Sequence, residues 1–514
     1  MNQHVTPRHW GGFVAMVVGM FMAILDIQIV ASSLKDIQAG LSASADEISW
    51  IQTSYLIAEV VMIPLTGYVA RLLSTRVLFT ISAGGFAISS LLCALAWDLN
   101  SMVIFRAIQG FIGGSMIPVT FAASFLMFPR EWRNNISVLM GLVATMAPTI
   151  GPSLGGWITE GTSWHWLFLI NLVPGIAVAA VVWTCIDIDK PNRALLKGID
   201  ILGFALMAVF LGCLEYVLEE GPRDDWMQDD LLRLLAIVAA VSAIGFFWRM
   251  FSYKNPIVDL RAFADRNFAL GCLYSFIIGV GMYGIVYVMP LFLAQVRGYN
   301  ALQIGEVMFV TGVFQFLSAP IAGRAAHVLD PRAMLILGLV LFGSGVYLQS
   351  QLTADWGFWE FFLPQAVRGL ALMFLFMPVN IMALGTLPPE RLQNASGLYN
   401  LMRNLGGAIG LAGINTIMQD RLALHWLRLV ENLTPGNPNM RAFLERAGDG
   451  FSIGLGEAGD SAAVKLLARM VRHQADVLTF SDVLLLMALV FFASVALIPL
   501  LRKPRPAPKS SGAH

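Results

Sequence analysis

Fourteen apolar runs, each long enough to cross a lipid bilayer, occupy most of the chain. A bilayer holds no water to satisfy backbone N–H and C=O groups, so segments of this length are predicted to span it as helices. We therefore predict an all-α integral membrane protein with fourteen transmembrane helices. The runs are 11–34, 48–70, 77–97, 101–126, 136–158, 165–186, 199–218, 231–252, 268–294, 302–326, 333–352, 358–384, 396–418 and 479–501.

The composition agrees with a membrane protein. Only 13% of the 514 residues are charged, against roughly a quarter in soluble proteins. The formal net charge is zero, so the overall charge gives no indication of a nucleic-acid partner. The four cysteines lie in apolar runs without a CxxC pair, so we predict neither a metal site nor a disulfide framework. The first run contains Asp26 and is too long for a signal peptide, so it is predicted to remain as a helix.

Lys and Arg residues gather in the loops on one side of the predicted membrane. Short cytoplasmic loops carry such an excess. The short loops on one side carry nineteen Lys and Arg residues and those on the other side carry three. This difference places both termini in the cytoplasm and the long segment 420–478 outside. The nineteen are Arg8, Arg71, Arg76, Arg130, Arg133, Lys190, Arg193, Lys197, Arg249, Lys254, Arg261, Arg266, Arg324, Arg332, Arg391, Arg502, Lys503, Arg505 and Lys509; the three are Lys35, Arg223 and Arg297.

Three short motifs recur in order at offsets of 256, 260 and 259 residues, which indicates two parallel six-helix halves. They are Pro64–Gly67 with Pro320–Gly323, Ile117–Ala123 with Met377–Ala383, and Pro129–Ser137 with Pro388–Ser396. The predicted domains are a first bundle at 1–190, two inserted helices at 191–258, a second bundle at 259–501 and a tail at 502–514. Segment 420–478 is either a flexible connector or a set of short amphipathic helices that lie on the bundle or on a partner. The sequence leaves both alternatives open.

Small residues form one face of the fifth run. At helical spacing Gly141, Ala144, Pro148, Gly151 and Gly155 share that face, so another helix backbone can approach closely. Pro148 and Pro152 loosen the helix. Ordinary tight packing would explain a short stretch of this kind. The length of the pattern, through Gly156, favours a helix on which the two halves hinge.

Several motifs resemble the fourteen-span drug:proton antiporters of the major facilitator superfamily, especially their EmrB-type branch. The matching stretches are Leu25–Val30, Gly67–Arg71 with Arg76, Arg106–Gly110, Gly141–Gly156, Trp164–Asn171, Asn255–Leu260 and Leu387–Leu392. The resemblance covers nearly the whole chain. It implies the major facilitator fold and proton-driven export across a bacterial inner membrane, with no cofactor besides the proton gradient. It also implies a periplasmic adaptor and an outer-membrane channel as partners.

The loop between spans 2 and 3 departs from that family. Most members have Asp where Arg71 stands and Gly where Ser74 stands, so their usual charge contact cannot form here. Gly67, Arg71 and Arg76 are the predicted cytoplasmic gate. For the two arginines, contact with phospholipid or with a helix end and a simple positive-inside anchor both stay open.

Charged residues deep in the membrane are costly unless paired or hydrated, so they should face one another and a cavity. Asp26 and Glu59 are the candidate proton carriers, with Arg106 as their modulator; purely structural pairing is the alternative. The predicted substrate cavity is lined by Gln28, Tyr55, Gln109, Arg368, Asn380, Asn400 and Arg403.

Substrate charge stays open, because deep acids suit lipophilic cations and deep arginines suit lipophilic acids. Efflux of lipophilic drugs is the predicted function. Export of one anionic metabolite, fatty acid or siderophore is the alternative. A membrane enzyme is disfavoured because the seven His lie at span ends, loops or tails and neither HExxH nor a Walker motif occurs. The paired halves favour alternating access over a passive channel.

Overall fold

The computed structural model describes residues 6–44, 47–224, 226–253, 256–431, 433–434, 436–455 and 459–502. Every regular element in these stretches is a helix, as predicted. Thirteen helical segments within them are long and apolar enough to cross a membrane. The predicted tail from residue 503 onward and Asn255 of the Asn255–Leu260 motif lie outside the described residues.

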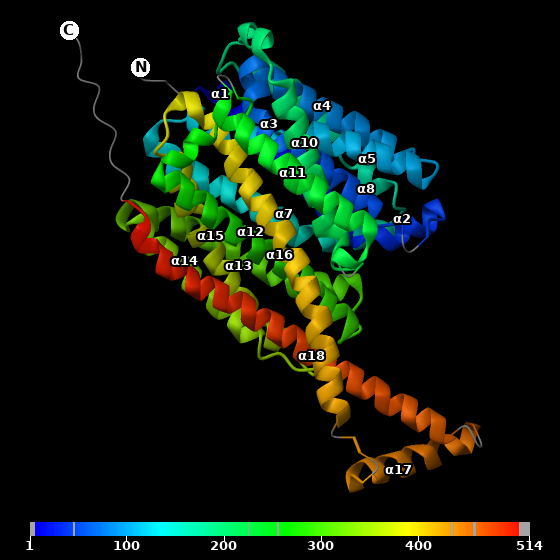
Figure 1. The fold of residues 1–514 in the computed structure, drawn as a ribbon. Helices are drawn as coiled ribbons and strands as arrows, with labels where there is room; N and C mark the ends of the chain where they lie inside the picture. The colour runs from blue at the N-terminus through cyan, green and yellow to red at the C-terminus, as the bar shows by residue number, and fades with distance from the viewer. Residues whose placement is uncertain are drawn as a thin grey trace, which may run out of the picture.

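The first half contains six spanning segments, two of which are built from two helices each (Figure 1). Short α2 (Leu34–Leu41) follows the first of them. The segments are α1 (Pro7–Ser32), α3 (Trp50–Leu73), α4 (Thr75–Ala94), α5 (Leu99–Gly113) with α6 (Met116–Met127), α7 (Arg133–Gly161), and α8 (Trp166–Leu169) with α9 (Leu172–Cys185).

The second half contains α12 (Arg266–Gln295), α13 (Ala301–Val328), α14 (Pro331–Gln349), α15 (Phe358–Leu384), α16 (Pro389–Glu431) and α18 (Gly459–Ser494). The predicted span 396–418 lies inside α16, which is not among the thirteen candidates. Polar side chains such as Asn400, Arg403 and Asn404 lower its hydropathy. Helix α16 nevertheless packs along α12 and α3, both of which are candidate spans. The count of fourteen spans stays a prediction.

The inserted pair α10 (Ile201–Glu220) and α11 (Asp230–Ser252) lies at the edge of the bundle. Only 22% of the apolar window of α11 is buried, so most of this helix is left to face lipid. Glu220 accepts a hydrogen bond from Ser49 next to α3 (3.0 Å), and Trp226 donates one to Thr416 of α16 (3.0 Å). The inserted pair therefore contacts both halves.

The segment between the last two long helices of the second half is helical in its described parts. Helix α16 continues to Glu431, α17 (Pro438–Leu455) follows, and α18 begins at Gly459 and runs without a break into its apolar part. Figure 1 shows this helical hairpin projecting beyond the bundle. The described part of the segment is thus helical, as one alternative predicted. Its helices extend α16 and α18 away from the bundle instead of lying on it, α17 packs against α18, and contact with a partner stays a prediction.

Both described chain ends lie at the opposite end of the bundle from α17 (Figure 1). We call this the terminal end. Arg8 donates from Nε to the carbonyl oxygen of Thr184 (2.9 Å), and the backbone N–H of Arg502 donates to the side chain of Asn267 (2.8 Å). These contacts fix the ends of α1 and of the last turn, η6 (Val495–Leu500), on their own halves.

Candidate functional site

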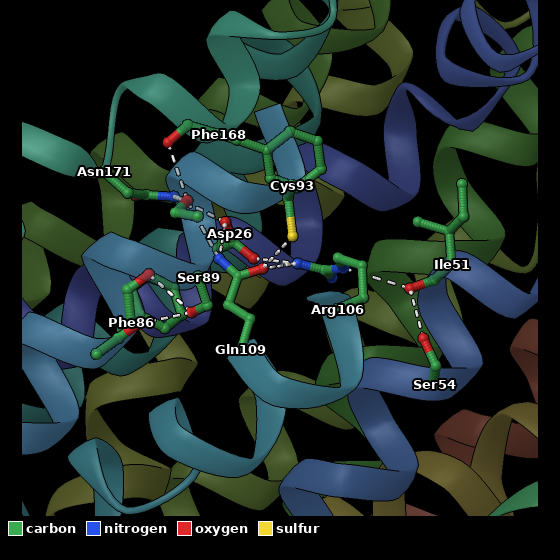
Figure 2. Close-up of polar contacts among 12 residues, drawn as sticks. Asp26, Ile51, Ser54, Phe86, Ser89, Cys93, Arg106, Gln109, Phe168 and Asn171 are labelled. Atoms are coloured by element: carbon green, nitrogen blue, oxygen red, sulfur yellow. Dashed lines mark hydrogen bonds and ion pairs between the residues drawn. The ribbon is translucent and has the colours of Figure 1, made fainter. Parts of the chain in front are cut away.

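Asp26 and Arg106 form an ion pair in the interior of the first half. Arg106 Nη1 donates to Asp26 Oδ2 at 2.6 Å, and neither side chain has exposed surface. The two residues lie on α1 and α5, so the pair joins two spans (Figure 2). A buried pair of this kind is stable only with good geometry and with its remaining polar atoms hydrogen-bonded.

Neutral amides complete the shell around the carboxylate. Asn171 donates from Nδ2 to Asp26 Oδ1 (2.7 Å), and Gln109 donates from Nε2 to the same oxygen (3.3 Å). Both amides also donate to Ser90 Oγ at 3.2 Å. Figure 2 shows Asp26 held between Arg106 and Asn171. Two residues of α5 and Asn171, the N-cap of α9, thus contact one carboxylate, and Ser90 of α4 accepts from both amides.

The guanidinium of Arg106 also contacts an aromatic ring and a backbone carbonyl group of α3. Its central carbon lies 4.2 Å from the ring centroid of Tyr55, and Nε donates to the carbonyl oxygen of Ile51 (3.3 Å). Within the described residues Nη2 has no hydrogen-bond partner, and neither has the hydroxyl of Tyr55. Two polar groups beside the pair are therefore available to water or to a ligand.

Glu59 and Arg403 carry opposite charges on helices from the two halves. Both are buried, at 2% and 3% exposure, and α3 packs against α16. Arg403 Nη2 donates to Asn400 Oδ1 (2.5 Å), and its guanidinium lies near the rings of Phe121 and Phe376. Glu59 Oε1 and Arg403 Nε and Nη1 find no partner in the described part of the chain. This interface holds charged groups that the protein alone leaves unsatisfied.

The remaining predicted cavity residues lie at several places rather than around one space. Asn380 donates weakly to Ser137 across the halves (3.4 Å), while Asn400 donates to the carbonyl oxygen of Ser396 within its own helix (2.9 Å). Gln28 is half-buried on α1 and packs beneath Gly151. Arg368 lies in the second half, on α15, next to a small cavity.

That cavity lies between α7 of the first half and helices of the second, and it offers about 20 Å³, room for one water-sized group. Of the predicted cavity residues, only Arg368 is in its lining. The lining comprises Thr145, Thr149, Met282, Ile285, Val286, Met308, Thr311, Phe342, Arg368 and Leu372.

The small face of α7 packs within the first half. A Cβ added to Gly151 would lie 2.4 Å from Gln28 Cβ, and one added to Gly155 would lie 2.8 Å from the carbonyl oxygen of Ile29. Both neighbours belong to α1. In this conformation Gly151 and Gly155 meet a helix of their own half, and their role in a hinge between the halves stays a prediction.

A different face of α7 meets the second half. Gly305 and Gly312 of α13 approach Ser153 and Thr149, and Gln315 donates to Thr145. Of the predicted hinge residues, Gly141 takes part, since its Cβ would lie 3.2 Å from Phe376 Cβ on α15. Pro148 is buried, whereas Pro152 and Gly156 are half-buried.

The chain from Gly151 to Gly155 also has the spacing G-x-S-x-G. In serine hydrolases that motif forms a sharp strand-to-helix turn. Here it lies in the middle of α7, and Ser153 packs beneath Gly305 of α13. The local structure thus does not present Ser153 as a nucleophile.

The predicted gate residues lie at the terminal end. Gly67 is in direct contact with the second half, because a Cβ there would lie 2.5 Å from Asn394 Cα. Arg71 donates to the carbonyl oxygen of Gly67 (3.2 Å), and the guanidinium of Arg76 lies 5.2 Å from the ring of Trp183. Neither arginine reaches a helix end of the second half in these contacts. Ser74, where the family has Gly, has φ +83°, a backbone conformation that favours Gly.

Sequence reasoning missed a three-residue contact across this end. Asp189 accepts from Thr75 through both backbone N–H and hydroxyl (2.8 Å each), and Gln393 of α16 donates to Asp189 Oδ2 (2.8 Å). We call Thr75, Asp189 and Gln393 the terminal latch. Gln393 belongs to the recurring motif Pro388–Ser396, which was the available signal.

Known proteins share much of this sequence. A model of the Major Facilitator Superfamily matches residues 16–411. The colistin resistance protein EmrB of Acinetobacter baumannii is 44% identical over 507 residues, 97% of this chain and 98% of the relative. The multidrug export protein EmrB of Escherichia coli is 31% identical over 495 residues, 96% of this chain and 95% of the relative.

Among solved structures, the proton:xylose symporter XylE matches with a TM-score of 0.57 at 13% identity, covering 95% of this chain and 96% of that chain. At this identity the likeness concerns the fold. The predicted family resemblance and fold class are confirmed, with the number of spans left open. The chain belongs to the major facilitator superfamily and is a multi-pass membrane transporter.

Proposed function

We propose that the protein exports lipophilic drugs or other toxic small molecules by alternating access, driven by protons moving inward. The observation that carries the proposal is the Asp26–Arg106 pair, a titratable carboxylate enclosed in the transport core without exposed surface. A buried charge pair is a costly way to achieve stability alone. In a membrane interior, ionisable residues mark ion or substrate paths.

Proton binding to Asp26 removes the charge that holds Arg106 Nη1. The guanidinium then keeps Gln109 and the carbonyl oxygen of Ile51 as acceptors, and its position against Tyr55 can change. Because Ile51 and Tyr55 are on α3, a shift of Arg106 is transmitted to the helix that contacts α16. Glu59 is on the same helix, facing the second half, and serves as a second proton site.

The relatives support the substrate class. Two proteins that align over nearly their full length are named for multidrug export and for colistin resistance. Met and Phe side chains are plentiful in the buried core, for example Met282, Met308 and Phe342, which line the small cavity beside Arg368. Flexible methionines adapt to ligands of different shapes. These features favour several lipophilic substrates over one specific metabolite.

Proteoliposomes with the purified protein test the proposal. When the side that is extracytoplasmic in cells faces the vesicle interior and that interior is acidic, ethidium, a lipophilic cationic dye, should accumulate inside. Collapse of the pH gradient with nigericin should abolish the flux. Flux that persists without any gradient would instead indicate a passive channel. The exposed variant Asp187→Asn is a matched control for acid substitutions.

We further propose that the protein resides in a bacterial inner membrane with its termini in the cytoplasm, and that a periplasmic adaptor and an outer-membrane channel complete the path. The projecting hairpin favours the proposal of an adaptor, because the hairpin lies at the end of the bundle opposite the chain termini (Figure 1). A photo-crosslinker at exposed Val464 of α18 should capture an adaptor encoded with the transporter. The same label at lipid-facing Ile244 of α11 is the control.

A further inference from the structure

Glu215 is a buried acid on the inserted helix α10. It is 5% exposed, although only 28% of the apolar window of α10 is buried. Gly203, Met207 and Leu211 are buried at the preceding four-residue steps, so Glu215 continues their stripe. Among the described residues, its carboxylate has no hydrogen-bond or ion-pair partner. An apolar side chain would cost less at this position, so packing does not explain the acid.

Two further acids of α10 lead from Glu215 to the end of the bundle opposite the terminal end, which we call the far end. Glu219 lies one helical turn further along and is half-buried, and Glu220 is the last residue of the helix. Glu220 accepts from Ser49 (3.0 Å) and lies 3.8 Å from Arg223, whose side chain is 43% exposed. Helix α3 begins beside Glu220 and ends at the terminal latch. The row of carboxylates therefore starts at the surface of the far end and runs inward.

The inner end of this row meets groups of both halves. The charge of Glu215 is within electrostatic range of Glu59 on α3. Tyr283 of α12 is within the same range of both acids and of Arg403 on α16. Tyr283 also packs against α16, because a Cβ at Gly407 would lie 2.5 Å from its ring. We call Glu59, Glu215, Tyr283 and Arg403 the acid junction.

The acid junction contains two carboxylates and one guanidinium. Glu59 and Arg403 are buried, and Glu59 Oε1 and Arg403 Nε and Nη1 have no partner in the described part of the chain. With both acids ionised the junction would carry a net negative charge inside a membrane protein, which is costly. One proton bound to Glu215 or Glu59 makes it neutral. The unsatisfied polar atoms suit water molecules, along which a proton passes between the acids.

Other charged groups of the neighbouring helices lie at helix ends or in the hairpin. On α11, Asp230 pairs with Arg233 (2.5 Å) and Arg249 pairs with Asp200 (2.9 Å), both near its ends. The titratable neighbours of Glu215 on α10 itself are Tyr216, Glu219 and Glu220. Besides the acid junction, the charged or His residues of α3, α12 and α16 are Arg71, Arg266, Glu390, Arg391, Asp420, Arg421, His425, Arg428 and Glu431.

We propose that the inserted pair supplies the path by which a proton reaches Glu59 from the far end, with Glu215 as the inner relay of that path. The inference rests on the proposed proton-driven export and gives α10 a part in it. A proton taken from water at Glu219 and Glu220 binds a carboxylate oxygen of Glu215. It then passes along water to Glu59, and Glu215 is a carboxylate again.

Arg403 makes the transfer depend on conformation. It belongs to the second half, whereas Glu59 belongs to the first, so relative motion of the halves changes its distance from the acids. Withdrawal of the guanidinium leaves two like charges close together and favours proton binding. Its return favours the ionised acids and proton release.

Ethidium exchange and net ethidium flux in proteoliposomes separate a proton path from a structural role. Exchange of radiolabelled for unlabelled ethidium at equal pH needs no net proton movement, whereas gradient-driven accumulation does. Glu215→Gln should keep exchange within twofold of the wild type and lower accumulation at least tenfold, and Glu215→Asp should lower it less. Glu160→Gln, at an exposed acid of α7, is the matched control and should behave like the wild type. An equal loss of exchange and accumulation in Glu215→Gln would overturn the proposal.

Glu215→Leu should change stability and transport in opposite directions. Because it removes an unpartnered buried acid from an apolar stripe, it should raise the melting temperature. It should nevertheless abolish gradient-driven accumulation. A lower melting temperature would show that the carboxylate stabilises the fold and would contradict its role as a relay.

Infrared difference spectra of the purified protein test proton binding without flux. On titration from acidic to alkaline pH, a carboxyl C=O band should disappear in the wild type and in Glu160→Gln, and this band should be missing from Glu215→Gln. Spectra of Glu215→Gln identical to the wild type would overturn the proposal, as would gradient-driven accumulation within twofold of the wild type. If the wild type itself shows no gradient-driven flux, export is refuted, and the infrared band still decides whether Glu215 binds a proton.

Discussion

The side-chain amide of Gln393 donates to Asp189 at 2.8 Å, and this bond joins the two halves at the terminal end of the bundle. Asp189 follows α9 of the first half, and Gln393 lies in the first turns of α16 of the second. Asp189 also accepts two bonds at Thr75, the first residue of α4. One carboxylate therefore connects the segment after α9, the start of α4 and the start of α16.

Asp189→Asn should loosen the terminal latch, because it removes the negative charge that accepts three hydrogen bonds. Bonds to charged groups are worth about 1.5–3 kcal/mol each, so the closed arrangement should lose a large part of its advantage. Ser396→Cys is a suitable reporter, since Ser396 is buried and donates to the carbonyl oxygen of Pro118 across the halves. Its maleimide labelling, read by mass spectrometry, should rise severalfold. Unchanged labelling, or an equal rise in Asp187→Asn, would remove the latch from the mechanism.

Gly67 and Gly323 occupy matching positions in the two halves and give a paired test of close approach. A Cβ at Gly67 would lie 2.5 Å from Asn394 Cα, whereas one at Gly323 would come no closer than 3.7 Å to Val138. Gly67→Ala should therefore hold the terminal end apart, raise labelling of Ser396→Cys and reduce efflux at least tenfold. Gly323→Ala should stay within about twofold of the wild type. Equal effects of the two variants would show that this contact does not control closure.

Gly151 should matter for the stability of the first half. An added Cβ would meet Gln28 Cβ at 2.4 Å, so Gly151→Ala should lower the melting temperature even though Ala favours helices by about 1 kcal/mol over Gly. Gly161→Ala on the same helix meets nothing within 4 Å and should be neutral or stabilising. The double variant Gly151→Ala/Gln28→Gly should be more stable than the sum of the single effects. Strict additivity would mean that the α1–α7 contact is not the cause.

Topology can be checked independently of transport. A reporter fused after His514 should be active only in the cytoplasm, and one inserted near Gly436 only outside it. The expectation comes from the distribution of Lys and Arg and from the even number of predicted spans. The reverse pattern would contradict both the orientation and the count of fourteen.

The sequence predicted helices well because spanning length and apolar composition are local properties. It predicted 101–126 as one span, and Leu99–Met127 is one candidate span; the break at Gly114 and Ser115 between α5 and α6 was not predicted. It chose Asp26 and Arg106 because charge within an apolar run is conspicuous. Asn171 was not singled out as a ligand of Asp26, since only the fold brings together residues 145 positions apart.

Asp189 was missed for a related reason. An acid in a polar loop resembles any solvated acid, and nothing local to it points to Gln393, which is 204 positions away. The small face of α7 was found correctly as a close contact, yet the partner helix was not. A pattern of small residues indicates that another backbone approaches closely, but it does not identify the helix to which that backbone belongs.

The Asp26–Arg106 pair should show whether its charge is needed for transport or only for folding. Arg106→Ala leaves a buried carboxylate unpaired and should destabilise the protein by about 3–5 kcal/mol. Asp26→Asn keeps the size of the side chain, but it leaves Arg106 without its counter-ion and should also lower stability. The double variant Asp26→Asn/Arg106→Gln buries no charge here, so it should regain most of the lost melting temperature.

Efflux then separates the two roles. If Asp26 carries the proton, the folded double variant should bind substrate and lose gradient-driven efflux in proteoliposomes. If the pair is structural, efflux should return together with stability. Full coupled efflux by the double variant would move the proton path to Glu59, which is also buried and whose Oε1 has no partner in the described chain. Glu59→Gln, measured in the same vesicles, would then be the variant expected to uncouple transport.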